Sequence, residues 1–301
     1  MKTTNYRRKK APKHKTYKLM SCAPIVIGKR VIKNSCYTSN AIEKIKQGYN
    51  RQYPDKQITE TDPETVWKIL KERLTECKNQ TEECWLETIQ NTQLQKKIDE
   101  YIFAPDAPPV WTKNPNEWLS NIDIEKVLRQ YEDAYPNFKF FSPTPIDFET
   151  RPHYYGGKCV SDELCNFSVS KLLENKKTKI GFIFNLDKHT QSGSHWVSMF
   201  LDLENKIIFY FDSTGEDIPE EIETFKNRIM KQATEQGIEL KFIKNHPQSH
   251  QYGNTECGMY SLYFIVSMLT LPHKKSIYLF KGKKRIPDKL MEKYRRIYFN
   301  I

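Results

Sequence analysis

The stretch HWVSMFLDLENKIIFYFD, residues 195–212, places two apolar runs on either side of a polar centre at Glu204 and Asn205. Two such runs around a turn signal predict a β-hairpin. In that hairpin His195 begins the first strand and Asp212 ends the second, so the two side chains lie close to opposite each other. A carboxylate there can hold one nitrogen of the imidazole and leave the other nitrogen available. The hairpin therefore predicts a sheet and one half of a catalytic site.

A cysteine follows in HQYGNTECGMYSLYF, residues 250–264, where Cys257 begins a long apolar helix. The N-terminus of a helix is the positive end of its macrodipole, which favours a thiolate. A neighbouring imidazolium stabilises the thiolate further. We therefore expect Cys257 to be a nucleophile, with burial of an ordinary cysteine in an apolar helix as the alternative.

Gln251 stands six residues before Cys257 in a polar loop. Its side-chain N–H, together with the backbone N–H of Cys257, predicts an oxyanion hole. The four residue types make up a thiol hydrolase: a thiolate attacks a carbonyl, an imidazole moves the proton, and a carboxylate orients the imidazole. The predicted catalytic residues are His195, Asp212, Gln251 and Cys257.

Three other residues are rivals for these roles. Asp202 lies on the same strand as His195, too far along it to reach the ring. His246 and His250 are close to Cys257 in sequence. Neither has a carboxylate on a paired strand, so we prefer His195 as the base.

Composition is that of a folded chain. Its 301 residues are 38% hydrophobic and include 17 Tyr, 16 Phe and 5 Trp, which allows a substantial core in one or two domains. No apolar run approaches the roughly 18 residues of a membrane-spanning helix. The first residues lack the apolar segment of a secretory signal. We expect no membrane span.

Seven cysteines include no C-x-x-C pair. An odd number without such pairs argues against a complete disulfide framework and against a four-cysteine zinc site. We therefore expect a reducing compartment, cytoplasm or nucleus, and neither a metal nor another cofactor.

Positive charge is concentrated at the N-terminus. The net charge is +11, residues 1–33 contain eleven Lys and Arg, and the first acidic residue is Glu43. Such a segment is typical of a tail that contacts nucleic acid through phosphates. A solvated extension and a localisation signal at RRKK, residues 7–10, are the alternatives.

The order of elements predicts an α+β fold with a mixed sheet and flanking helices. We divide the chain into a basic extension (1–40), a helical arm (41–110) and a core (111–301), because prolines 105, 108, 109 and 115 interrupt the helical pattern. In the arm we expect one helix from Pro63 and a second from Thr81 to about Tyr101. In the core we expect helices at 120–131, 219–237, 257–269 and 287–299, and strands at 138–141, 179–186 and 239–245.

The runs GSHW (193–196), FDS (211–213) and Q-x5-C-G (251–258) resemble the ubiquitin-like-protein-specific cysteine proteases, the clan of SUMO proteases and adenain. The resemblance implies a papain-like or adenain-like core in which His, Asp, Gln and Cys act in this chain order. EWLSNIDI, residues 117–124, is similar to the W-L-N-D-x-x-I element of SUMO proteases, whose tryptophan covers the substrate. Trp118 is the matching position, and Asn121 stands where those enzymes carry Asp.

A closer resemblance is to the polyprotein-maturation proteases of large cytoplasmic DNA viruses such as African swine fever virus. LSNIDIEKVLRQYEDAY (119–135), GSHWVSMFLDLENK (193–206) and KYRRIYF (293–299) carry it, over about residues 117–301. It implies an N-terminal helical arm domain and cleavage of a viral structural polyprotein after Gly-Gly or Ala-Gly, in host-cytoplasmic assembly sites and virions. The viral enzymes use Asn as third member, whereas this chain has Asp212.

The implied preference for glycine has a physical reason. A channel roofed by flat rings admits only residues without side chains before the cut. We expect Trp118 and Trp196 to form the roof and Gly258 to leave space for the substrate carbonyl, with core packing as the alternative for each tryptophan. Two other functions stay open: a ubiquitin or SUMO deconjugase, and a basic nucleic-acid-binding scaffold with an inactive core.

Overall fold

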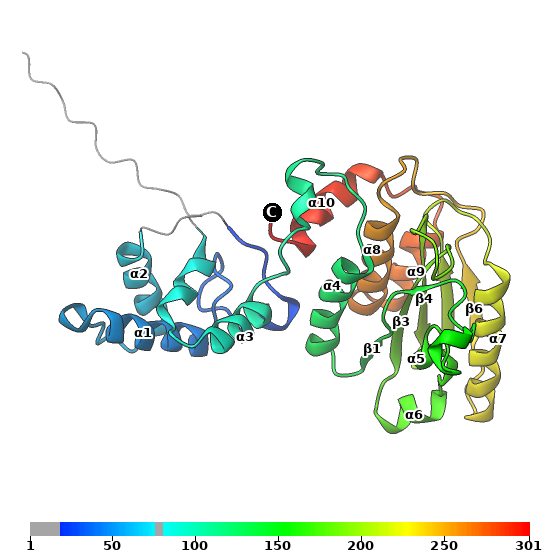
Figure 1. The fold of residues 1–301 in the computed structure, drawn as a ribbon, viewed down its shortest axis with the longest axis horizontal. Helices are drawn as coiled ribbons and strands as arrows, with labels where there is room; N and C mark the ends of the chain where they lie inside the picture. Colours follow the sequence, from blue (N-terminus) through cyan, green and yellow to red (C-terminus); the bar gives the residue numbers. More distant parts are fainter. Residues whose placement is uncertain (1–18, 76–80) are drawn as a thin grey trace, which may run out of the picture. The chain divides into compact units, whose positions relative to one another are not determined.

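The computed structural model describes residues 19–75 and 81–301. The chain forms two compact units, the first extending to Cys22 and over Val26–Phe103, the second comprising Ala23–Ile25 and Ala104–Ile301 (Figure 1). The division falls at Phe103, seven residues ahead of the end expected for the arm. The boundary lies there because the proline-containing segment that follows Phe103 belongs to the second unit, where it pairs with the C-terminus of the chain. Ala107 N donates to Asn300 O at 2.8 Å, and Asn300 Nδ2 donates to Ala104 O at 2.7 Å.

Helices make up most of the first unit, as expected of an arm. The expected helix from Pro63 is present and is capped by Asp62, whose side chain accepts from Thr65 N. The prediction of a single helix from Thr81 is wrong, because a new helix begins after Asn91. The side chain of Asn91 caps that helix by accepting a hydrogen bond from Leu94 N. The elements are α1 (Ser39–Gln52), α2 (Pro63–Arg73), α3 (Thr92–Ile102) and the 3-10 helices η1 (Pro24–Val26, partly in the second unit), η2 (Pro54–Lys56) and η3 (Glu82–Thr88).

Helix α1 has no counterpart among the expected elements. Its apolar residues are few, and the ones that are buried, among them Ile42, Ile45 and Tyr49, follow helical spacing within a polar sequence. Thr38 caps it by accepting from Ala41 N.

A six-stranded mixed sheet forms the centre of the second unit. The order is β1-β3-β4-β5-β6, with β2 also paired to β3. Pairing is antiparallel between β3, β4 and β5 and parallel elsewhere. The strands are β1 (Phe138–Phe140), β2 (Thr144–Pro145), β3 (Lys179–Asn185), β4 (Trp196–Asp202), β5 (Ile207–Phe211) and β6 (Lys241–Lys244).

Helices cover both faces of this sheet, with α8 and α4 on one side and α7 on the other (Figure 1). Alternate residues of β4 belong to the two cores: Phe200 packs with α8, whereas Met199 packs with α7. Because both faces of the central strands are buried, β3, β4 and β5 are largely apolar. The helices are α4 (Asn121–Ala134), α5 (Asp162–Cys165), α6 (Val169–Glu174), α7 (Glu220–Glu235), α8 (Cys257–Thr270), α9 (His273–Lys281), α10 (Asp288–Tyr298) and the 3-10 helices η4 (Pro109–Thr112) and η5 (His153–Tyr155).

The predicted hairpin is formed by β4 and β5. Ser198 pairs with Phe211 and Asp202 pairs with Ile207. If this register is continued beyond the ends of the strands, His195 lies two residues away from the position directly opposite Asp212. The two residues are therefore diagonal neighbours across the hairpin. Diagonal neighbours in an antiparallel pair are within reach of long side chains.

The expectation of no disulfide framework is wrong for the described residues. Cys22 is bonded to Cys36 and Cys159 to Cys165, and Cys84 is also disulfide-bonded. Among the cysteines that the structure describes, Cys257 is the free one. The spacing of the cysteines in the sequence does not reveal these bonds.

Within residues 19–75 and 81–301, no helix has the length and apolar character needed to cross a bilayer. The same ranges contain no cluster of His, Cys, Asp or Glu suited to a metal ion.

Candidate active site

His195 and Asp212 meet where the hairpin ends. His195 immediately precedes β4 and Asp212 immediately follows β5. The Nε2 atom of His195 lies 2.8 Å from Oδ1 of Asp212. The carboxylate is 1% exposed, whereas the imidazole is 19% exposed. A buried carboxylate thus holds a partly exposed imidazole.

Asp212 is itself fixed by its neighbours. Its Oδ1 accepts from the N and the Oγ1 of Thr214, both at 2.8 Å. Asn245 holds its backbone on both sides: Asp212 N donates to Asn245 Oδ1 at 3.0 Å, and Asn245 Nδ2 donates to Asp212 O at 2.6 Å. Oδ2 accepts no hydrogen bond from any residue that the structure describes. These contacts fix the orientation of the Asp212 carboxylate relative to the imidazole of His195.

The side chain of Cys257 interacts with the same imidazole. Burial lowers the pKa of His195, but the hydrogen bonds and charges of Asp212 and Cys257 outweigh burial and raise that pKa to about 10. Since Nε2 faces Asp212, the sulfur is left with Nδ1. The ring therefore lies between a carboxylate and a thiol, and both favour its protonated form.

The sulfur stands on the first residue of α8. Glu256, before it, makes no side-chain cap bond to this helix. The first donor within the helix is Tyr260 N, which reaches Glu256 O at 2.9 Å. The N–H groups of Cys257 and Gly258 therefore have no partner inside the helix. They are available to a negatively charged oxygen at the positive end of the helix dipole.

Gln251 is joined to the end of β5 through Ser213. Ser213 Oγ donates to Gln251 Oε1 at 2.8 Å, and Gln251 N donates to Ser213 O at 2.7 Å. The amide Nε2 donates one hydrogen to Gly253 O at 2.8 Å. A primary amide has two donor hydrogens, so one remains for a ligand. The structure thus ties Gln251 to the strand end that carries Asp212.

The rival residues are engaged elsewhere. Asp202 accepts from Asn205 N at 2.9 Å and Nδ2 at 2.8 Å, which closes the hairpin turn. His246 Nδ1 donates to Gly215 O at 2.8 Å. His250 is buried between backbone groups of Phe280 and Ile286, and burial lowers its pKa.

Trp196 and Gly258 pack against Leu119. Trp196 is 8% exposed, and its Nε1 donates to Leu119 O at 3.1 Å. A Cβ on Gly258 would lie 3.1 Å from Leu119 Cβ and 3.3 Å from Trp196 Cδ1. The missing side chain of Gly258 thus allows close packing of α8, a different reason from the open space expected for a substrate carbonyl.

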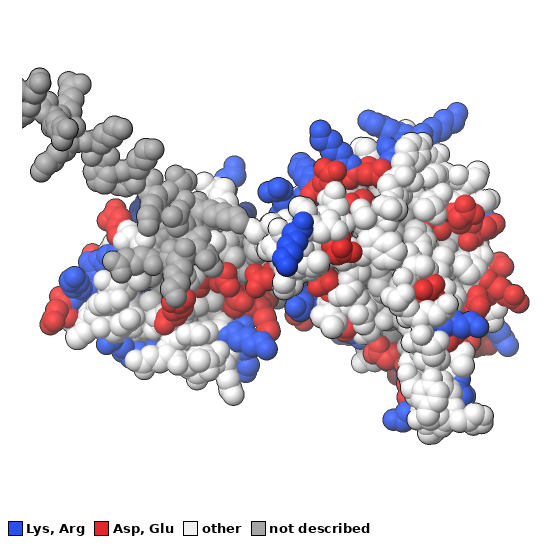
Figure 2. Space-filling model, turned by 45° about the horizontal axis from the view of Figure 1, so that its top comes forward, with Lys and Arg blue, Asp and Glu red and all other residues white. Residues whose placement is uncertain are grey.

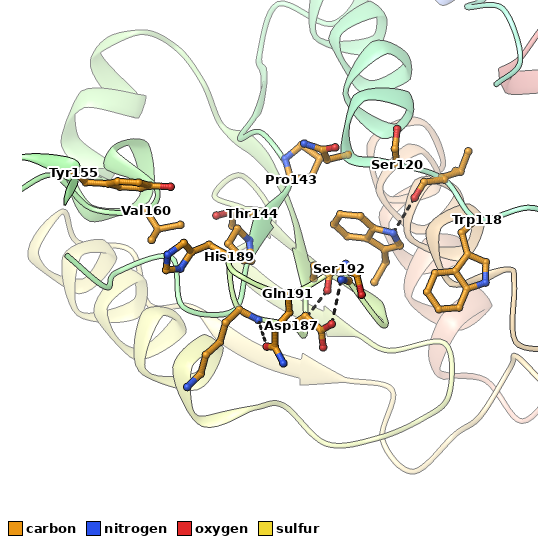
Figure 3. A pocket seen from close by; sticks show the side chains of 17 residues that line it. Trp118, Ser120, Pro143, Thr144, Tyr155, Val160, Asp187, His189, Gln191 and Ser192 are labelled. Atoms are coloured by element: carbon orange, nitrogen blue, oxygen red, sulfur yellow. Dashed lines mark hydrogen bonds between the residues drawn. The ribbon is translucent and has the colours of Figure 1, made fainter. Parts of the chain in front are cut away.

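Trp118 and Trp196 both line a cavity of about 550 Å³. Trp118 is 39% exposed. Figure 3 shows it at one end of the cavity, with Tyr155 and His189 at the other. None of the four predicted catalytic residues lines this cavity. It adjoins them through Trp196, the neighbour of His195.

A second histidine–carboxylate pair lies on the cavity wall. His189 Nδ1 is 2.7 Å from Asp147 Oδ2, and Tyr154 OH is 2.7 Å from His189 Nε2. Both ring nitrogens are engaged and no described cysteine thiol is free near it, so this pair orders the loop between β3 and β4. No sequence pattern predicted this pair or the supporting role of Asn245. Thr214 stands in FDSTG, residues 211–215, directly after the predicted catalytic Asp212.

Basic side chains also gather near the C-terminus of the second unit. On the face drawn in Figure 2, Lys and Arg follow the upper edge of that unit. The positive charge is therefore not confined to the N-terminal segment. Eight exposed cations lie between residues 274 and 296: Lys274, Lys275, Lys281, Lys283, Lys284, Lys289, Lys293 and Arg296.

A protein-family model matches much of the second unit. Residues 137–300 match the Ulp1 protease family, C-terminal catalytic domain. This range is more than half of the chain and contains all four predicted catalytic residues.

Two viral proteins are similar to more than two thirds of the chain. A putative thiol protease of Acanthamoeba polyphaga mimivirus is 29% identical over 259 residues, 79% of this chain and 81% of its own length. A cysteine protease of African swine fever virus (strain Badajoz 1971 Vero-adapted) is 27% identical over 215 residues, 69% of this chain and 75% of its own. The crystal structure of an African swine fever virus protease has the same fold, with a TM-score of 0.64 at 23% identity over 95% of this chain and 97% of that one.

Proposed function

The chain belongs to the Ulp1 protease family and is a cysteine protease, and from this premise we propose that it cleaves a viral structural polyprotein after Gly-Gly or Ala-Gly during virion maturation. Viral relatives named as thiol or cysteine proteases support the viral setting.

Acylation uses Cys257 and His195. The thiolate of Cys257 attacks the carbonyl carbon of the residue before the cut, and the proton of the thiol resides on His195. A protonated ring is stabilised here, because the pKa of His195 is raised to about 10. As the C–N bond breaks, this imidazolium gives its proton to the leaving amine, and a thioester remains on Cys257.

Charge on the carbonyl oxygen is stabilised by two donors. The backbone N–H of Cys257 has no partner within α8, and Gln251 has one amide hydrogen beyond the one given to Gly253 O. Donors fixed in this way act without reorganising as charge develops. Hydrolysis then reverses the roles: neutral His195 takes a proton from water and the hydroxide attacks the thioester carbon. The C–S bond breaks, the carboxyl product leaves, and the thiolate of Cys257 is restored beside protonated His195.

Substrate selection is assigned to the two tryptophans. Trp196 is held by its hydrogen bond to Leu119 O, while Trp118 is partly exposed. Rings over a narrow channel leave room for residues that have no side chain. This supports a diglycine or Ala-Gly requirement before the cut.

One observation carries the proposal: the imidazole of His195 lies 2.8 Å from the buried carboxylate of Asp212 and also interacts with the side chain of Cys257 at the start of α8. The test is mass spectrometry of a panel of X-Gly-Gly-X and X-Ala-Gly-X peptides, with Leu or Val replacing either glycine as the matched control. We expect release only where the small residues are intact. Equal cleavage of the control peptides that carry Leu or Val, or no cleavage of any peptide, would contradict the proposal.

A deconjugase is the second candidate, and a specific observation favours it: some African swine fever virus relatives are named SUMO-1 cysteine protease. Ubiquitin and SUMO end in diglycine, so the same catalytic residues would serve. Ubiquitin-vinyl and SUMO-vinyl probes separate the two functions. Rapid labelling of Cys257 by either probe favours the deconjugase, whereas labelling only by short diglycine probes favours the polyprotein protease.

We also propose host-cytoplasmic assembly sites and the virion as the places of action, and nucleic-acid contact by the basic N-terminal segment. Residues 1–18 of that segment lie outside the described residues. Binding of duplex DNA by the full chain and by a chain lacking residues 1–18, measured over a salt series, tests the contact. Equal affinities for both chains would contradict it.

A further inference from the structure

Helix α10 carries two charged residues, Asp288 and Arg295, that both contact the loop between Gln251 and Cys257. They are seven residues apart, which is two helical turns, so they lie on one side of the helix. Asp288 contacts the beginning of the loop and Arg295 contacts its end.

Arg295 holds the residues directly before the nucleophile. It is 2% exposed, and its guanidinium donates to Glu256 Oε2 from Nη2 at 3.1 Å and from Nε at 3.2 Å. Nη2 also donates to Thr255 O at 3.3 Å. Both side chains of the ion pair are almost fully buried, at 3% and 5% exposure. Removing one partner would leave a buried charge unpaired.

The same guanidinium reaches the segment that leads into Trp118. Nη1 donates to Glu117 O at 2.8 Å, and Nη2 donates to Asn116 O at 3.3 Å. The group lies 4.4 Å from the ring centre of Trp111. One buried cation therefore links the backbone before Cys257 to the backbone before Trp118.

Asp288 holds the beginning of the loop. Its carboxylate accepts from Tyr252 N at 3.2 Å and from Gly253 N at 3.3 Å. It also accepts from Tyr260 OH at 2.8 Å and from Arg285 Nη2 at 2.7 Å. Gly253 O is the acceptor for the Gln251 amide. The carboxylate of Asp288 thus fixes the residues that aim Gln251.

We infer that α10 sets the position of Gln251 relative to Cys257, with Asp288 and Arg295 as positioning residues for the oxyanion hole. Neither residue touches the reacting atoms, and the inference rests on the proposed function. Arg295 also positions the Trp118 segment, so it acts on substrate binding as well. Packing of α10 is separate, because Met291 and Tyr298 bury it in the core.

Four variants of the full chain test the inference: Asp288→Ala and Arg295→Met, with Glu292→Ala and Lys293→Ala as controls. The controls remove the same charges from exposed positions of the same helix. We expect Asp288→Ala to lower kcat about 100-fold with KM unchanged, since small displacements of catalytic groups have effects of that size. Arg295→Met is expected to lower kcat and to raise KM.

Alkylation of Cys257 by iodoacetamide separates positioning from loss of fold. His195 and Asp212 are untouched by these variants, so we expect the alkylation rate to stay at the unsubstituted value while cleavage falls. Equal losses of alkylation and cleavage, or kcat values equal to those of the two controls, would overturn the inference. If either variant fails to fold, Asp288→Asn and Arg295→Lys replace them under the same criteria. Absence of cleavage by the unsubstituted chain would overturn the proposed function, and the inference with it.

Discussion

His195 Nε2 lies 2.8 Å from Asp212 Oδ1 although the two residues are two positions out of direct opposition across the hairpin. The contact is diagonal, and Thr214 and Asn245 fix the carboxylate that makes it. The orientation of the imidazole therefore depends on the end of β5 as much as on the register of the strands.

Substitution of Cys257 or His195 by alanine should abolish cleavage of a Gly-Gly peptide. Each change removes a group that bonds to or protonates the reacting atoms, and we expect a loss of kcat of at least about 1,000-fold. Thermal unfolding monitored alongside should show a folded protein. Full activity in either folded variant would refute the assignment.

Asp212→Asn should reduce activity less than Cys257→Ala does. The amide can no longer stabilise a positive charge on His195, but the nucleophile and the oxyanion donors stay in place. We expect its loss in kcat to be roughly 10- to 100-fold smaller than that of Cys257→Ala. Steady-state kinetics of both variants checks this; an Asp212→Asn enzyme as inactive as Cys257→Ala would mean that the carboxylate does more than orient.

The raised pKa of His195 predicts how stability depends on pH. A group whose pKa is higher in the folded state than in the unfolded state adds to the free energy of unfolding. This contribution is complete at pH values below the unfolded-state pKa and is lost as pH rises through the folded-state pKa. For His195 the window runs from the ordinary value of 6.5 to about 10.

Denaturant unfolding of the unsubstituted chain and of His195→Gln, from pH 6 to pH 10, measures this contribution. The difference in unfolding free energy between the two proteins should shrink as pH rises. A difference that is constant, or that grows with pH, would show that the ring is not protonated in the folded state.

Gly258→Ala should disturb both packing and substrate binding. The added Cβ would meet Leu119 Cβ at 3.1 Å and Trp196 Cδ1 at 3.3 Å. Overpacking of this kind costs about 1–3 kcal/mol of stability. Displacement of Trp196 should also raise KM.

Gly253→Ala is the matched control, because a Cβ there meets no atom within 4 Å. It is a control for packing alone, and it should leave the free energy of unfolding near the value of the unsubstituted chain. Equal effects of the two substitutions would show that the close approach at Gly258 has no special role.

Sequence reasoning located the hairpin, the apolar helix after Cys257 and the α+β class, because each depends on local patterns. Order and spacing also suggested that His195, Asp212, Gln251 and Cys257 act together. The structure brings His195 into contact with Asp212 and Cys257, and it links Gln251 to Asp212 through Ser213.

Other features depend on contacts between distant residues. Arg295 forms hydrogen bonds with Glu256 and Glu117, which are 39 and 178 positions away in the sequence, so no local sequence pattern predicts these contacts. The disulfides likewise depend on which cysteines the fold brings together. The start of a new helix after Asn91 did have a local signal, because Asn is a common N-cap residue. The apolar periodicity on both sides of Asn91 instead suggested one continuous helix.

Catalysis by this site requires a sulfur whose proton is held by His195. The rate of iodoacetamide alkylation of Cys257 at pH 6, followed by peptide mapping in the unsubstituted chain and in His195→Ala, measures this directly. We predict fast, selective alkylation of Cys257 in the unsubstituted chain and a much slower reaction in the variant. Equal rates in the two proteins, or a Cys257 that reacts no faster than an ordinary thiol, would contradict the central claim.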